Sequence, residues 1–216
     1  MALFGFAAFG CSRPTYAAAD LPQPAADLPA AKAGETRAVV FAGGCFWCTE
    51  AVFEQLAGVS EVVSGYAGDS KDKADYEKVS AGQTDHAEAI RITYDPSKIT
   101  YGQLLRVFFA THDPTTKDRQ GPDRGKQYRS AIFYANEDEQ RVADGYIKQL
   151  NDAKLFSAPV VTTLEPLSQF YPAEQYHQDF VKRNPSHPYV QQWAVPKVEK
   201  VKEKFGEQLK TADVQK

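Results

Sequence analysis

The sequence contains few cysteines, no long hydrophobic run and no large excess of charge of either sign. Its three cysteines, Cys11, Cys45 and Cys48, are too few for a disulfide framework. A chain of 216 residues also buries enough surface to fold without one. No segment reaches the roughly 20 apolar residues that a membrane-spanning helix needs. The formal net charge of −3 implies no broad basic face, so we expect no nucleic-acid partner. The hydrophobic content of 43% is that of a globular protein with a single main domain.

The two ends of the chain differ from its middle. Residues 1–34 hold eleven Ala and four Pro without periodicity, so we predict that residues 1–36 form a disordered or signal-like leader. The short apolar start and the small residues before Asp20 resemble a secretory signal, although the usual basic opening is missing. We therefore expect a periplasmic or membrane-anchored protein rather than a cytoplasmic one, with a plain disordered leader as the alternative. Residues 37–196 are assigned to the folded domain. Residues 197–216, with six Lys and four acidic residues, are assigned to a charged C-terminal helix or tail.

Hydrophobic patterning predicts alternating strands and helices in the folded domain. Strands are expected over residues 37–42, 59–66, 86–94, 128–135 and 160–164, and helices from 46 to a stop at Gly58, from 101, from 137 and over 173–182. Two helix starts carry capping sequences, Thr100 with Gln103 and Asn136 with Glu139. The order β-α-β-β-α-β-α-β favours an α+β fold. We expect a two-layer α/β sandwich with a ferredoxin-like, split βαβ core.

The sharpest local feature is the run Gly43-Gly44-Cys45-Phe46-Trp47-Cys48, where a predicted strand ends and a helix begins. The glycines permit a tight turn. A cysteine at a helix N-terminus lies where the helix dipole favours its thiolate. Cys48 follows about one turn later on the same face. The pattern is typical of a redox-active or nucleophilic cysteine. A disulfide exchanger, a structural zinc site lacking two ligands, and two inert buried cysteines are the alternatives.

A carboxylate lies on an apolar face of the third predicted strand. Glu88 shares that face with Ile90 and Ile92, so it must be paired, solvated at the strand end or kept protonated by desolvation. An ion pair with an arginine such as Arg129 is one interpretation, and a general acid with a raised pKa is the other. His86 is on the same face, and we interpret it as a structural histidine.

The aromatic residues between the two cysteines also have two interpretations. Phe46 and Trp47 are either ordinary core residues or the wall of a pocket. A reacting thiolate needs water excluded and an apolar substrate group held nearby, so we favour the pocket.

Several further motifs occur in order over roughly residues 37–190. They are Gly44-Cys45-Phe46-Trp47, Gly65-Tyr66-Ala67-Gly68, His86-Ala87-Glu88-Ala89, His112-Asp113-Pro114, Asp118-Arg119-Gln120-Gly121 and Gln127-Tyr128-Arg129-Ser130. Together they resemble the motifs of A-type peptide methionine sulfoxide reductases, which would make residues 37–196 a catalytic reductase domain. Two positions depart from the family pattern: Asp85 stands where Gly is usual, and Lys126 stands where Thr is common.

The resemblance implies an enzyme that reduces methionine-S-sulfoxide, free or in proteins, and so repairs oxidised proteins. It implies no metal or organic cofactor, and recycling by thioredoxin or a similar dithiol. We expect the enzyme to be a monomer. Phe46 and Trp47 match the family's pocket for the substrate methyl group, and Asp123 matches a carboxylate near the substrate.

The resemblance also implies roles for the reacting groups. Cys45 matches the nucleophile that attacks the sulfoxide sulfur. Glu88 matches the acid that protonates the sulfoxide oxygen, and Tyr76 and Tyr128 match two tyrosines that hydrogen-bond it. Reduction would leave Cys45 as a sulfenic acid. We predict that Cys48 resolves this sulfenic acid as a disulfide, which an external dithiol then reduces.

Overall fold

The computed structural model describes residues 21–32 and 34–210. Its strands are β1 (Arg37–Gly43), β2 (Val59–Ala67), β3 (Ala87–Tyr94), β4 (Arg119–Gln120), β5 (Asp123–Arg124), β6 (Ser130–Tyr134), β7 (Thr163–Pro166) and β8 (Phe170–Pro172). Its α-helices are α1 (Phe46–Phe53), α2 (Tyr76–Ser80), α3 (Tyr101–Thr111), α4 (Glu137–Asp152), α5 (Phe180–Arg183) and α6 (Val195–Lys204). Short helical turns are η2 (Lys71–Lys73), η3 (Lys126–Tyr128), the π-helical η4 (Val190–Ala194) and η5 (Gly206–Gln208). In this part of the chain no helix combines the length and apolar character needed to cross a membrane.

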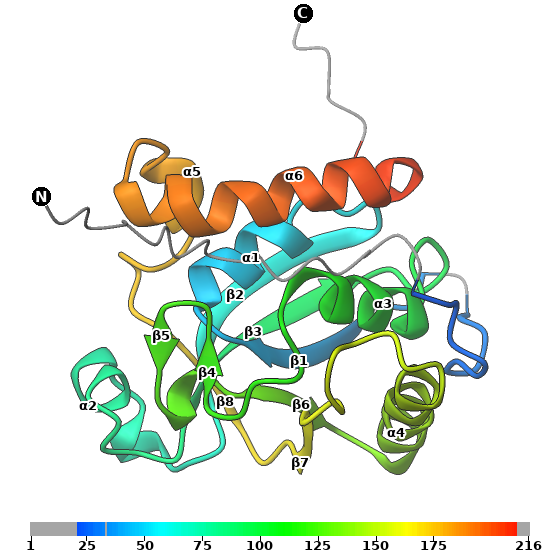
Figure 1. Cartoon of the computed structure of the whole chain (residues 1–216), viewed down its shortest axis with the longest axis horizontal. Helices are drawn as coiled ribbons and strands as arrows, with labels where there is room; N and C mark the ends of the chain where they lie inside the picture. Colours follow the sequence, from blue (N-terminus) through cyan, green and yellow to red (C-terminus); the bar gives the residue numbers. More distant parts are fainter. Residues whose placement is uncertain (1–20, 33, 211–216) are drawn as a thin grey trace, which may run out of the picture.

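Six strands form one sheet in the order β7-β6-β1-β3-β2-β8 (Figure 1). Strand β3 is antiparallel to both β1 and β2, so β1 and β2 run parallel with β3 between them, and α1 connects them. Strand β6 is antiparallel to β1, and β7 is parallel to β6. Strands β4 and β5 form a separate small hairpin. A mixed sheet with helices in one unit confirms the predicted α+β class.

The core lies between the sheet and helices α1 and α3, and α6 crosses over α1 (Figure 1). The Phe41 ring of β1 has its centroid 5.9 Å from that of Phe53 in α1 and 5.0 Å from that of Phe108 in α3. All three rings are fully buried, which contributes roughly 1.5–3 kcal/mol each. The opposite face of the sheet is covered by the chain around β8, where Phe170 packs with small side chains such as Ala89. Both sheet faces are therefore buried near the predicted site.

The predicted capping sequences start α3 and α4. The Thr100 side chain accepts the N–H of Gln103, whose side chain in turn accepts the Thr100 N–H, so the capping box is complete. The Asn136 side chain accepts the N–H of Glu139. These local hydrogen bonds satisfy N–H groups that a helix start otherwise leaves free, which is why both helices begin where the sequence predicts.

Residues 21–32 lie against α3 and α4 in an irregular, extended form. The Arg106 side chain donates to the carbonyl of Leu21 at 2.8 Å, and the Tyr146 hydroxyl donates to that of Pro22 at 2.8 Å. The Asp27 carboxylate accepts the N–H of Gly102 in the first turn of α3, at 3.0 Å. This stretch thus differs from the predicted disordered leader. The signal-like run and Cys11 lie outside the described residues.

The C-terminal helix packs onto the domain. Val201 and Phe205 are buried against the core, and the Arg106 guanidinium lies 5.3 Å from the Phe205 ring centroid. The helical path runs from η4 into α6 without a break, so the predicted boundary at residue 196 falls within it. Residues 211–216 of the predicted tail lie outside the described part.

The predicted helix over residues 173–182 is wrong, since only α5 is α-helical there. Side-chain contacts override the local pattern: the Gln178 amide bonds both the N–H and the carbonyl of Ser64 in β2, each at 2.9 Å. The Glu174 carboxylate accepts the N–H of Tyr76 at 2.9 Å. These residues tie the segment to the sheet edge and to α2. Helix α1 also ends at Phe53, earlier than the predicted stop at Gly58.

Candidate active site

Cys45 lies in the turn between β1 and α1 and forms the N-cap of the helix. The turn requires glycine at position 44, where φ is +89° and an added Cβ would lie 2.4 Å from side-chain atoms of Gln120. The Cys45 residue is 8% exposed, and Cys48, one turn on, is 1% exposed. The strand–glycine–cysteine–helix arrangement is where the sequence predicts it.

The two thiols form a coupled pair. Burial raises the pKa of Cys45 well above its usual value, and its contact with Cys48 raises it further. The same contact lowers the pKa of Cys48 to about 7, against burial. The sequence predicts the lowered pKa for Cys45, whereas in the resting site it belongs to Cys48, because the Cys45 thiol donates to the Cys48 sulfur. Near pH 7 the Cys48 thiol is therefore about half ionised, whereas Cys45 remains protonated.

Glu88 lies beside this pair on the α1 face of β3. It is 2% exposed, and its Oε2 accepts the backbone N–H of Phe46, the first residue of α1, at 3.0 Å. Burial raises the pKa of Glu88 to about 8, and the charge of Asp123 adds to the rise. The alternative ion pair with Arg129 does not form, because the Arg129 guanidinium bonds both carboxylate oxygens of Glu165, at 2.9 and 2.8 Å. Glu88 is therefore a mostly protonated acid at neutral pH.

Tyr76 and Tyr128 come from different segments, the start of α2 and the end of η3. Both are half-buried. Burial raises the pKa of Tyr76 to about 12 and also raises the pKa of Tyr128. The charge of Glu88 is the second cause in both cases, and that of Cys45 also contributes. The fold thus brings both phenols close to the carboxyl and the thiol, and both remain protonated at physiological pH.

Tyr189 is a site residue that the sequence does not predict. Its hydroxyl donates to Oδ2 of Asp123 at 2.5 Å, and it also contacts the sulfurs of Cys45 and Cys48, which lowers the pKa of each. Burial raises the pKa of Asp123, and this hydrogen bond opposes the rise. Tyr189 follows Pro188 in the helical turn that leads into η4, and no spacing pattern connects it to the cysteines.

An aromatic wall stands next to Cys45. The Trp47 ring stacks on Phe180 with centroids 3.7 Å apart, and its Nε1–H donates to Nδ1 of His177 at 3.1 Å. Phe46 is 1% exposed, with its ring centroid 5.0 Å from that of His177. Phe46 is thus part of the core, while Trp47 is only partly buried.

A groove of about 720 Å³ opens on another side of the cysteines. Cys45 and Cys48 line it, with the chain around β4 and β5 on one wall and the η4–α6 segment, including Trp193 and Lys197, on the other. Trp47, Tyr76 and Tyr128 are not among its lining residues. The bonded pair Asp123–Tyr189 lines the groove as well.

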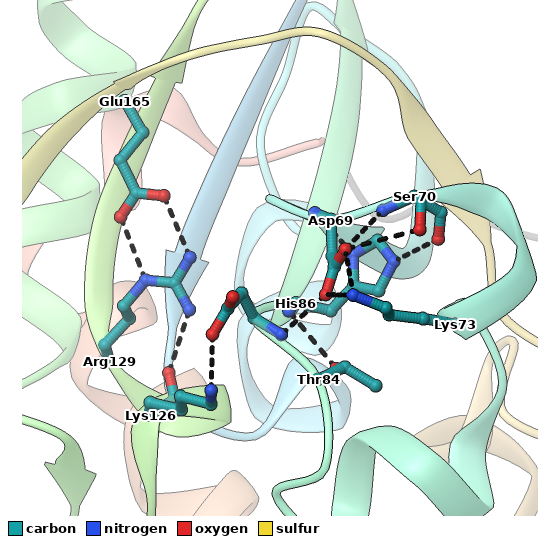
Figure 2. Close-up of polar contacts among 9 residues, drawn as sticks. Asp69, Ser70, Lys73, Thr84, His86, Lys126, Arg129 and Glu165 are labelled. Carbon is teal, nitrogen blue, oxygen red and sulfur yellow. Dashed lines mark hydrogen bonds and ion pairs between the residues drawn. The ribbon is translucent and has the colours of Figure 1, made fainter.

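His86 has the structural role that the sequence suggests. It is fully buried, its Nδ1 accepts the N–H of Asp69 at 3.2 Å, and its Nε2 lies 3.0 Å from the carbonyl of Ser70 (Figure 2). The imidazole thus fixes the loop that follows β2.

Asp85 and Lys126, the two departures from the family pattern, form an ion pair with each other. Asp85 is three residues before Glu88, and Lys126 is in the same turn as Tyr128. The Asp85 N–H donates to the Asp69 carboxylate at 2.8 Å, so Asp85 belongs to the same loop as His86. The pair connects the loop before β3 to the turn before β6.

A buried acid and two phenols around a cysteine at a helix N-terminus define a class of nucleophilic-cysteine sites in an α+β domain. Residues 37–209 match the family described as peptide methionine sulfoxide reductase. The chain belongs to this family.

Its relatives span nearly the same length. The chain is 53% identical over 180 residues to a peptide methionine sulfoxide reductase of Mesorhizobium japonicum, covering 83% of this chain and 91% of that one. It is 47% identical over 193 residues to a peptide methionine sulfoxide reductase of Synechocystis, covering 88% of this chain and 90% of that one. Among solved structures, the fold is similar to reduced Mxr1 of Saccharomyces cerevisiae, with TM-score 0.64, 32% identity, and 72% of this chain and 90% of that chain covered. It is also similar to methionine sulfoxide reductase A of Corynebacterium diphtheriae, with TM-score 0.63, 31% identity, and 77% and 84% covered.

Proposed function

We propose that the protein reduces methionine-S-sulfoxide, free or in proteins, to methionine. The observation that carries this proposal is the buried Glu88 carboxyl, which has a pKa of about 8 and lies at the start of the helix that Cys45 caps. A sulfoxide sulfur is a poor electrophile until its oxygen is protonated. A neutral acid beside a thiol supplies that proton without placing a second anion next to the nucleophile.

The first step uses the ionised Cys48 sulfur as the acceptor of the Cys45 proton. As Cys45 attacks the sulfoxide sulfur as a thiolate, its proton passes to Cys48, while Glu88 protonates the oxygen. The sulfur–oxygen bond of the substrate then breaks and the oxygen transfers to Cys45. The products are methionine and a Cys45 sulfenic acid.

The remaining site residues hold the substrate. The hydroxyls of Tyr76 and Tyr128 donate to the sulfoxide oxygen, which the raised pKa of each phenol supports. Trp47, backed by Phe46, takes the methyl group. Asp123, held by Tyr189, orients the part of the substrate that lies next to the groove.

Cys48 then resolves the sulfenic acid. Its lowered pKa and its contact with Cys45 favour attack on the Cys45 sulfur, which releases water and forms a disulfide. Thioredoxin or a similar dithiol reduces this disulfide. Because the two half-cystines are three residues apart at a helix start, we expect the bond to be strained and easily reduced.

Activity assays with both sulfur epimers test the proposal. We expect methionine from the S epimer of methionine sulfoxide with dithiothreitol as reductant, and almost none from the R epimer, because a fixed methyl wall and a fixed oxygen site accept one orientation. The Cys45→Ser variant should be inactive, since a hydroxyl at its ordinary pKa is too weak a nucleophile. Insulin disulfide reduction without methionine formation would instead identify a disulfide exchanger.

Three further points are part of the proposal. We interpret the core as ferredoxin-like, which the strand order β6-β1-β3-β2 and the parallel β1–α1–β2 unit support. We propose that the protein is a monomer, which size-exclusion chromatography with light scattering tests. We also propose export or membrane anchoring, and mass spectrometry of the mature N-terminus tests it.

A further inference from the structure

Lys197 is a half-buried cation in the wall of the groove next to the cysteines. It lies in the first turn of α6 and lines the groove together with Cys45 and Cys48. Its ammonium group makes no hydrogen bond or ion pair among the residues that the structure describes. By contrast, Lys202 of the same helix bonds Glu199 at 2.9 Å. An ammonium group in the wall of the groove that Cys48 lines can stabilise negative charge on the Cys48 sulfur.

The groups facing Cys48 come from several elements and differ in sign. Cys45 at the start of α1 donates to the Cys48 sulfur, Tyr189 contacts it, and the positive charge of Lys197 favours its thiolate. The negative charge of Asp123 opposes that thiolate, and so does the charge of Glu88 when it is ionised. The charge of Lys197 thus offsets the charges of the carboxylates, which would otherwise raise the pKa of Cys48.

Other titratable groups also line the groove, and one of them, Lys200, lies on α6 with Lys197. His112 is buried, and its burial lowers its pKa to about 4, so it is neutral at pH 7. Asp113, Arg119 and Lys200 also line the groove. Of all these groups, Lys197 is the cation that acts on the Cys48 charge.

We propose that Lys197 is a positioning residue for the resolving step: its ammonium group holds Cys48 as a thiolate facing the Cys45 sulfenic acid. The inference rests on the proposed role of Cys48. In that step the Cys48 thiolate attacks the Cys45 sulfur, the sulfur–sulfur bond forms and the sulfur–oxygen bond breaks. The Cys48 sulfur is oxidised, the Cys45 sulfur is reduced, and the departing hydroxide takes a proton to become water.

The first test measures the Cys48 thiol directly. In full-length protein carrying Cys11→Ser and Cys45→Ser, Cys48 is the only thiol, and its rate of alkylation by iodoacetamide against pH reports its titration. Adding Lys197→Met should move the midpoint up by roughly one pH unit, because a nearby opposite charge shifts a pKa by about 1–3 units and Lys197 is partly solvated. Lys197→Arg should restore the midpoint, and Lys202→Met, with the same loss of charge on the same helix, should leave it unchanged. Equal midpoints in Lys197→Met and its parent would overturn the inference.

The second test follows a single turnover at pH 7 in the absence of reductant. With all cysteines present, Lys197→Met should release as much methionine as wild type but form the Cys45–Cys48 disulfide about fivefold more slowly, as a one-unit rise in pKa predicts. A disulfide that forms equally fast in both proteins contradicts the role of Lys197 and leaves the proposed function intact. No disulfide in wild type would instead remove the proposed role of Cys48, and this inference with it.

Discussion

The protonation state of Glu88 decides whether the site delivers a proton at neutral pH. Because its raised pKa is about 8, methionine release should be fast below pH 8 and should fall as the pH rises through that value. Glu88→Gln keeps the shape but has no proton to give, so we expect a rate loss on the order of 10² or more at pH 7. Stopped-flow or quench measurement of methionine release from pH 5 to 9 checks both expectations.

Glu50 provides the matched control for Glu88. It is also a buried glutamate, in α1, and its burial raises its pKa to about 7. Glu50→Gln should leave methionine release near the wild-type rate. If Glu50→Gln removed the pH dependence and Glu88→Gln retained it, the acid would be misassigned.

The same carboxyl makes folding depend on pH. The folded-state pKa of Glu88, about 8, is above its ordinary value of 4.5, so the folded state keeps a proton that the unfolded state loses between these values. This group therefore lowers the unfolding free energy as pH rises from about 4.5 to 8. Glu88→Gln lacks this slope, so its stability relative to wild type should improve from pH 5 to pH 9 by a few kcal/mol, at about 1.4 kcal/mol per unit. Urea unfolding at the two pH values measures the difference, and an unchanged difference would show that Glu88 is ionised when folded.

Cys48 can be tested apart from the nucleophile. Cys48→Ser should still release about one methionine per enzyme without reductant, but more slowly, because Cys48 no longer accepts the Cys45 proton. It should then stop at the Cys45 sulfenic acid and turn over poorly with thioredoxin. Dithiothreitol should rescue turnover by direct attack on the sulfenic acid. An undiminished thioredoxin-dependent rate would mean that Cys48 only packs against Cys45.

At the scale of elements, the Asp85–Lys126 ion pair joins the two segments that carry Tyr76 and Tyr128. Both side chains are substantially exposed, so the pair is worth at most about 1 kcal/mol. We expect Asp85→Asn and Lys126→Met each to raise KM up to about fivefold at low salt, with little change in kcat. The effect should shrink in high salt because exposed charges are screened.

Charge exchange makes this prediction specific. Asp85→Lys combined with Lys126→Asp should bring KM most of the way back to the wild-type value, because the two opposite charges can still form an ion pair. Lys98→Met removes a comparable exposed pair with Asp95, outside the site, and should change neither constant. Failure of the exchange, with KM as high as in the single variants, would assign the effect to something other than the pair.

Elements governed by local sequence could be predicted, and those governed by distant partners could not. Thr100 and Asn136 cap helices through neighbours three residues away, so both helix starts are visible in the sequence. The alternation that marks Glu88 as buried is likewise local. The segment around Gln178 has a helical pattern, but its hydrogen bonds to Ser64 join residues 114 apart and replace the helix. Tyr189 could not be predicted for the same reason. The fold brings it to the cysteines from a distant part of the sequence, and no motif marks it.

At the scale of the whole molecule, residues 21–32 hold α3 and α4 together from outside the catalytic core. Leu21 of this segment is buried, and the Asp27 carboxylate accepts the Gly102 N–H in the first turn of α3. The sequence of residues 21–32, which we call the strap, has no hydrophobic periodicity that would predict this packing. An irregular extended segment can pack without the repeating apolar pattern of a helix or strand. A chain starting at residue 37 should be less stable than one starting at residue 21 by roughly 1–3 kcal/mol, from lost apolar burial and hydrogen bonds.

Thermal unfolding of the two truncated chains measures that loss. Activity at 25 °C should be similar in both, because the hydrogen bonds of residues 21–32 go to α3 and α4, away from the turn that carries Cys45. Equal melting temperatures would mean that the strap contributes nothing to stability.

A single turnover on separate sulfur epimers tests the central claim most directly. Reduced enzyme is mixed with excess methionine-S-sulfoxide or methionine-R-sulfoxide without reductant, methionine is counted per enzyme, and peptide mapping locates the oxidised cysteines. We expect about one methionine per enzyme from the S epimer only, with a disulfide between Cys45 and Cys48. Methionine from both epimers equally, or none from the S epimer while Cys45 stays reduced, would contradict a reductase built on Cys45 and Glu88.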